Sequence, residues 1–137
     1  MLFLTTGVSA CLETSGQRRD ELRTAVQELV PPEGRIRANG FGDCVELASS
    51  PSCAGAVFEL PQHASGARAR AVRATAVAKG WTVAQMDDAE GGWSLYLKRG
   101  DLRANVFLWR PEVYHLSCAG SHPDDKCFNT ADVERSS

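Results

Sequence analysis

Apolar residues recur at helical spacing in two segments of the chain. The first segment, residues 17–30, stops at two consecutive prolines and carries apolar positions on one side: Leu22, Ala25, Val26, Leu29 and Val30. The second segment runs from Ser65, a residue type favoured at helix N-caps, to Gly80, which suits a left-handed C-terminal cap. Because this second segment is rich in alanine, its buried side can lie close against a sheet. We expect a helix in each segment.

The pattern of apolar and polar residues changes to a period of two in the second half of the chain. It predicts an antiparallel meander with strands at residues 82–86, 93–98 and 102–109. A two-residue turn at Arg99-Gly100 sets the expected register of the last pair. It would place Lys98 opposite Asp101. Short segments bounded by Gly, Pro and Ser predict two or three further strands upstream, at residues 35–38, 43–48 and 54–60.

These elements together predict an α+β fold, a two-layer sandwich in the order α-β-β-α-β-β-β. Both helices would lie on one face of an antiparallel sheet of about five strands. Strand alternation assigns an aliphatic set to the helix-covered face: Trp93, Leu95, Leu97, Leu102, Ala104 and Val106.

The opposite face of the predicted sheet carries a mixed aromatic and polar set: Tyr96, Arg103, Asn105, Phe107 and Trp109. We expect the C-terminal segment, from residue 111 onward, to fold over this face. The alternative is a binding face, because exposed aromatic rings beside an arginine are typical of recognition surfaces.

The length of the chain indicates a single domain, and its charge argues against a nucleic-acid-binding protein. The 137 residues suit one domain, and 43% hydrophobic with 23% charged residues is ordinary globular usage. A formal net charge of -2 supplies no basic field, which argues against nucleic acid as a partner because phosphate binding depends on clustered Lys and Arg.

The five cysteines divide into four plus one. Cys44 and Cys53 bracket one turn-rich stretch, and Cys118 and Cys127 bracket another with the same separation, so two local disulfides are the favoured pairing of the three possible. Each ring would stabilise the fold by about 2 to 3 kcal/mol. The alternatives are reduced cysteines in a cytosolic protein, or zinc ligands. Cys11 is left without a partner.

The apolar stretch at residues 2–8 runs into two small residues and a cysteine, after which the chain becomes polar. Val8-Ser9-Ala10-Cys11 resembles the lipobox of bacterial lipoproteins. The size and the Ala, Arg and Gly usage are similar to those of short lipoproteins from high-GC Gram-positive bacteria. The resemblance implies that the cysteine is acylated, becomes the mature N-terminus and holds the protein on the outer face of the cell membrane.

The resemblance also implies a division of the chain. Residues 1–10 would be a shortened signal-peptide-like segment, residues 11–16 the lipid attachment and linker, and residues 17–137 one α+β domain with a disulfide-closed tail. No Lys or Arg precedes the apolar stretch, so we expect the true start to lie upstream of Met1. No other stretch approaches the roughly twenty apolar residues of a membrane span.

The sequence gives little support for an enzyme, because it contains no recognisable catalytic motif. The sequence contains no nucleophile elbow, metalloprotease helix, P-loop or dinucleotide-binding turn, and it predicts no cofactor and no metal site. The leading hypothesis is a non-catalytic binding module exposed at the cell envelope, with an envelope protein or a cell-wall ligand as partner. The alternatives are a small extracytoplasmic enzyme that uses His115 or His122 with nearby carboxylates, and a soluble cytosolic domain with reduced cysteines.

Overall fold

A computed structural model describes residues 15–42, 53–60, 65–119 and 123–135. Its helices are α2 (Ser15–Leu29) and α3 (Gly66–Ala78), with short 3-10 turns η1 (Pro111–Tyr114) and η2 (Asp125–Cys127). Its strands are β1 (Arg35–Gly42), β2 (Cys53–Glu59), β3 (Thr82–Ala89), β4 (Gly92–Arg99), β5 (Leu102–Trp109) and β6 (Asn129–Arg135). The predicted α+β fold is confirmed, although the described sheet has six strands rather than about five.

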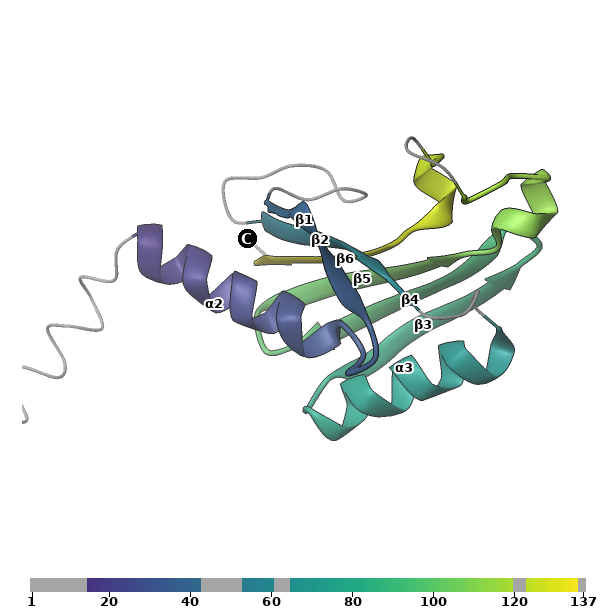
Figure 1. Ribbon diagram of the computed structural model, residues 1–137. Coiled ribbons are helices and arrows are strands. Elements are labelled where there is room, and N and C mark those ends of the chain that lie inside the picture. The colour runs from purple at the N-terminus through teal and green to yellow at the C-terminus, as the bar shows by residue number, and fades with distance from the viewer. Residues whose placement is uncertain (1–14, 43–52, 61–64, 120–122, 136–137) are drawn as a thin grey trace, which may run out of the picture.

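All neighbouring strands of the sheet are antiparallel, and their order is β1-β2-β6-β5-β4-β3. Both helices lie on the same face (Figure 1). Within the described residues, neither helix is long and apolar enough to cross a membrane.

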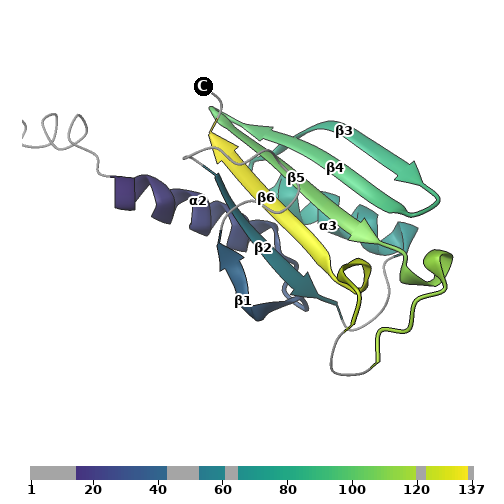
Figure 2. The same ribbon diagram turned by 90° about the horizontal axis from the view of Figure 1, so that it is seen from above.

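The last strand, β6, is the main departure from the predicted topology. The segment that was expected to fold over the sheet instead ends inside it, between β2 and β5 (Figure 2). Its residues Asn129 to Val133 include alanine, asparagine and aspartate, which are depleted in strands, so the pattern is weak in the sequence. The structure compensates because Ala131 and Val133 are completely buried in the core, on a strand that packs against α2.

The core lies between the helices and one face of the sheet. The strands contribute the predicted aliphatic residues, and Leu95, Leu97 and Val106 are at most 1% exposed. Helix α3 buries Ala69, Val72 and Ala76, small side chains that let its backbone approach the sheet closely. The assignment of the two faces of β4 and β5 is therefore confirmed.

The register between β4 and β5 differs from the expectation by two residues. Arg99 is opposite Leu102, so the turn is Gly100-Asp101 rather than Arg99-Gly100. Gly100 has a φ of 60°, the positive value that primed hairpin turns require at their first central position. A shift of two residues leaves every side chain on its expected face but changes the partner of Lys98 from Asp101 to Arg103.

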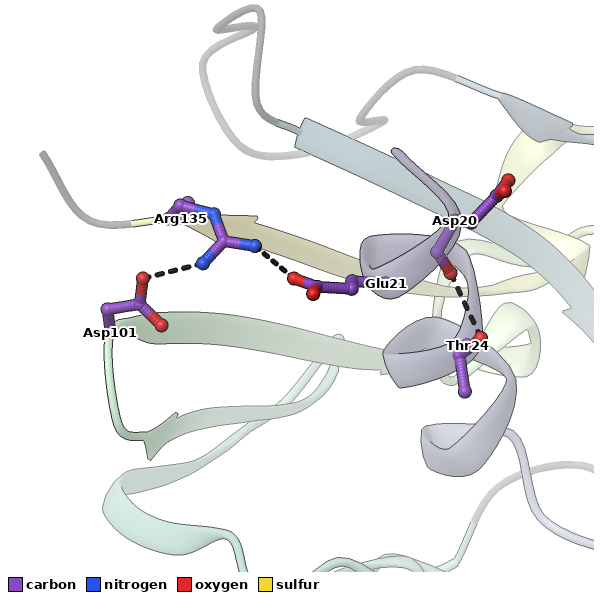
Figure 3. A network of polar contacts seen from close by, with 5 residues as sticks. All are labelled: Asp20, Glu21, Thr24, Asp101 and Arg135. Atoms are coloured by element: carbon purple, nitrogen blue, oxygen red, sulfur yellow. Dashed lines mark hydrogen bonds and ion pairs between the residues drawn. The ribbon is translucent and has the colours of Figure 1, made fainter. Parts of the chain in front are cut away.

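An ion-pair network joins the first helix to the far end of the sheet (Figure 3). The Arg135 guanidinium of β6 lies 2.6 Å from the Asp101 carboxylate in the β4–β5 turn and 2.5 Å from that of Glu21 in α2. Arg135 donates hydrogen bonds to Asp101 and Glu21, and these bonds raise the pKa of its guanidinium above the ordinary value. The bond to Asp101 has the larger effect. Arginine is protonated at all ordinary pH values, so the network keeps its cation throughout the neutral range.

The position of β6 gives a direct test of the topology. Deleting residues 129–137 would remove the shared neighbour of β2 and β5 and take Ala131 and Val133 out of the core. We expect this variant to lose cooperative unfolding in urea, monitored by circular dichroism, because two new strand edges and a gap in the core remain. A truncated chain that still unfolds cooperatively would contradict the central placement of β6.

Candidate binding face

The sheet face that points away from α2 and α3 is called the outer face here. Cross-strand pairing places its residues in rows. One row runs through Cys53, Glu134, Arg103, Lys98 and Thr82, and the next through Gly55, Asp132, Asn105, Tyr96 and Gln85. Because alternate residues of a strand point to opposite faces, these side chains share the side opposite the core.

The five residues predicted as a binding face all belong to the outer face, but their exposure differs. Tyr96 is 38% exposed and Arg103 is exposed, whereas Asn105 is buried. Phe107 and Trp109 are half-buried. The structure therefore divides the predicted set into an open part, a buried part and an aromatic part. Their role in binding stays a prediction.

The aromatic part lies at one end of the outer face, beside the C-terminal segment. The ring centroids of Phe107 and Trp109 are 4.4 Å apart, and Tyr114 of η1 meets Trp109 edge to face at 5.8 Å. The Lys126 ammonium of η2 lies 5.4 Å from the Trp109 ring centroid and 5.3 Å from that of Tyr114. A Cβ on Gly91 would come 2.1 Å from the Tyr114 hydroxyl oxygen. At this end, the C-terminal segment packs on the outer face.

A disulfide joins the segment that follows η1 to η2, beside this aromatic cluster. Cys118 and Cys127 are disulfide-bonded, as predicted. Cys53 is also disulfide-bonded. Cys44, its predicted partner, and Cys11, the predicted lipidation site, both lie outside the described residues.

The centre of the outer face is polar and buried. Asp132 is completely buried, and Asn105 and Thr130 are 6% and 5% exposed. The amide oxygen Oδ1 of Asn105 and the hydroxyl Oγ1 of Thr130 have no hydrogen-bond partner within the described structure. Buried polar atoms of this kind cost roughly 1 to 3 kcal/mol each unless water or a ligand satisfies them. Sequence reasoning found only Asn105, because the strand that carries Thr130 and Asp132 was missed.

The open part is a hollow of about 270 Å³ over β3, β4, β5 and β6. It is lined by Ala84, Gln85, Tyr96, Leu97, Lys98, Arg103, Ala104 and Glu134. The Arg103 guanidinium lies 2.6 Å from the Glu134 carboxylate. Lys98 faces Arg103 directly across the β4–β5 pair and has no ion-pair partner within the described residues. Lys98 was missed in the sequence because the expected register placed it opposite an aspartate.

The two histidines of the enzyme hypothesis are not brought into a site by the described structure. His115 is exposed, follows η1 with a left-handed φ of 55°, and forms no ion pair with a carboxylate in the described segments. His122 lies outside them. Across the part of the chain that the structure describes, no three His, Cys, Asp or Glu side chains come together as metal ligands would.

Fold and site together define a disulfide-bonded α+β domain whose sheet has one helix-covered face and one partly open face. No protein-family model, curated protein or solved structure matches the chain. The side chains of the outer face thus provide the basis for proposing a function.

The contribution of the Cys118–Cys127 disulfide to stability can be measured. Replacing Cys118 and Cys127 together by serine should lower the free energy of unfolding by about 2 to 3 kcal/mol, because the unfolded chain regains the freedom of the loop. Urea unfolding measures this loss. The Trp109 fluorescence should also change in the folded state, since Tyr114 and Lys126 are then less firmly held on its ring. If neither the free energy of unfolding nor the fluorescence changes, the disulfide does not stabilise this part of the fold.

Proposed function

We propose that this protein is a non-catalytic, lipid-anchored module of the cell envelope that binds its partner on the outer face of the sheet. The observation that carries the proposal is the hollow beside Tyr96, on a face that neither described helix covers. The partner would be an envelope protein or a cell-wall ligand.

Location is supported by the cysteines. Disulfides persist in oxidising compartments and are rare in the cytosol, so the bonded Cys118, Cys127 and Cys53 favour an exported protein over a cytosolic one. The lipobox-like Val8-Ser9-Ala10-Cys11 supplies a reason for an odd number of cysteines in such a protein. Acylation of Cys11 would place the domain outside the membrane.

The outer face has the physical properties of a binding surface. Its residues project from central strands of a sheet, which hold side chains more firmly than loops do. Tyr96 offers an apolar ring with a polar hydroxyl, and tyrosine and arginine are enriched in the cores of interfaces. The surface combines an exposed ring, a lysine and an arginine–carboxylate pair, so it can contact both apolar and charged groups of one ligand.

The anchor is tested by the mass of the protein isolated from its native membrane. We expect cleavage before Cys11 and a mass increase on that cysteine that corresponds to fatty acyl groups. Cys11→Ser should move the protein from the membrane fraction to the soluble fraction. An intact, unmodified N-terminus in a chain expressed from the full gene would overturn the anchor.

The binding face is tested with a photo-crosslinking amino acid placed at Tyr96 in the anchored protein. The matched control position is Val77, which is 51% exposed on α3, on the helix side of the molecule. We expect a discrete crosslinked product, identified by mass spectrometry, at Tyr96 but not at Val77. The product should weaken when Arg103→Ala is added. Equal products at both positions would mean that the outer face is not the binding surface.

A further inference from the structure

Two cations face each other on the outer face at the hollow. Lys98 and Arg103 are direct cross-strand partners on β4 and β5, and both are exposed. Like charges directly opposite in an antiparallel pair destabilise a sheet. The repulsion between Lys98 and Arg103 therefore lowers the stability of the free protein, and a bound anion would relieve this repulsion.

The carboxylate of Glu134 relieves only part of this repulsion. It lies 2.6 Å from Arg103, on the strand at the other side of β5, and no ion pair to Lys98 occurs within the described residues. The charged residues that line the hollow are two cations and one carboxylate, which leaves a net charge of +1. A single carboxylate would neutralise this charge. A phosphate carries more than one negative charge at neutral pH and would exceed it.

The rest of the hollow is less polar. The Tyr96 ring precedes Lys98 by two residues on the same face of β4, and Ala84 of β3 contributes another apolar side chain. The volume of about 270 Å³ falls just below the range of typical ligand pockets, so the hollow would hold one end of a ligand rather than enclose all of it.

We propose that this hollow captures a carboxylate group that has an apolar or aromatic group beside it. Lys98 and Arg103 hold the carboxylate, Glu134 keeps Arg103 in position, and the Tyr96 ring contacts the apolar group. Such a group occurs at the C-terminus of a peptide and in small free acids. This inference rests on the proposed binding function and specifies its ligand chemistry.

The test is calorimetric titration of the full chain, with its disulfides intact, with four probes. N-acetyl-phenylalanine and the peptide acetyl-Ala-Ala-Phe carry the carboxylate, the amide of the first removes the charge, and inorganic phosphate supplies a different anion. We expect both acids to bind, and the amide and phosphate to bind at least roughly tenfold more weakly, since a charge-assisted contact is lost or mismatched. Tighter binding of the peptide would identify a chain terminus as the source, and equal binding a small acid.

The variant Lys98→Gln tests whether Lys98 binds the ligand or only supports the fold. It should weaken binding of both acids roughly tenfold and, because the like-charge pair is removed, raise the melting temperature of the free protein by about 1 to 4 °C. The rise should shrink at high salt. The control is Lys79→Gln, an exposed lysine at the C-terminal end of α3, which should leave binding of both acids unchanged and should not raise the melting temperature, because a cation is favourable at that end of a helix.

Three results would overturn the carboxylate assignment: equal binding of acid and amide, phosphate binding as tight as that of the acids, or Lys98→Gln without effect on the acids. A crosslink that persists at Tyr96 in those cases would leave the proposed binding function standing. Loss of the Tyr96 crosslink together with retained acid binding would instead overturn the proposed function alone.

Discussion

The fold depends on the burial of one sheet face under two helices, and β6 makes that face continuous. Ala131 and Val133 join the core residues of β2 to those of β5, so a hydrophobic layer extends across strands that are distant in sequence. Arg135 at the end of the same strand links α2 to the β4–β5 turn. Because the helices occupy only this face, the outer face is left for polar and aromatic side chains.

The hydrophobic pattern was sufficient to predict the two helices, the meander and the division of β4 and β5 into two faces. Leu95, Leu97 and Val106 fit a period of two, and because the register error was an even number of residues, it left the faces unchanged. The pattern was insufficient for β6, whose core contribution comes from one valine and one alanine. Such a strand is specified by its neighbours in the sheet more than by its own residues.

The residues of the candidate site could likewise be predicted only in part from the sequence. The aromatic and arginine residues of the outer face could be found in the sequence, because strand alternation places them on the face opposite the apolar set. Lys98 and Glu134 could not, since a charged residue on a strand usually points to solvent without a role. Lys98 and Glu134 become candidates because both are cross-strand partners of Arg103. These pairings depend on the register of β4 with β5 and on the position of β6, which only the structure shows.

The central place of β6 also affects the order in which the sheet can form. Strands β2 and β6 pair across some 75 residues of sequence, from Phe58 with Asn129 to Cys53 with Glu134, so the two halves of the sheet cannot join until β6 pairs with both β2 and β5. Before that step, the edges of β2 and β5 and the apolar side of α2 are exposed. The insertion of β6, rather than the formation of the first helix and hairpin, is the step that completes this fold.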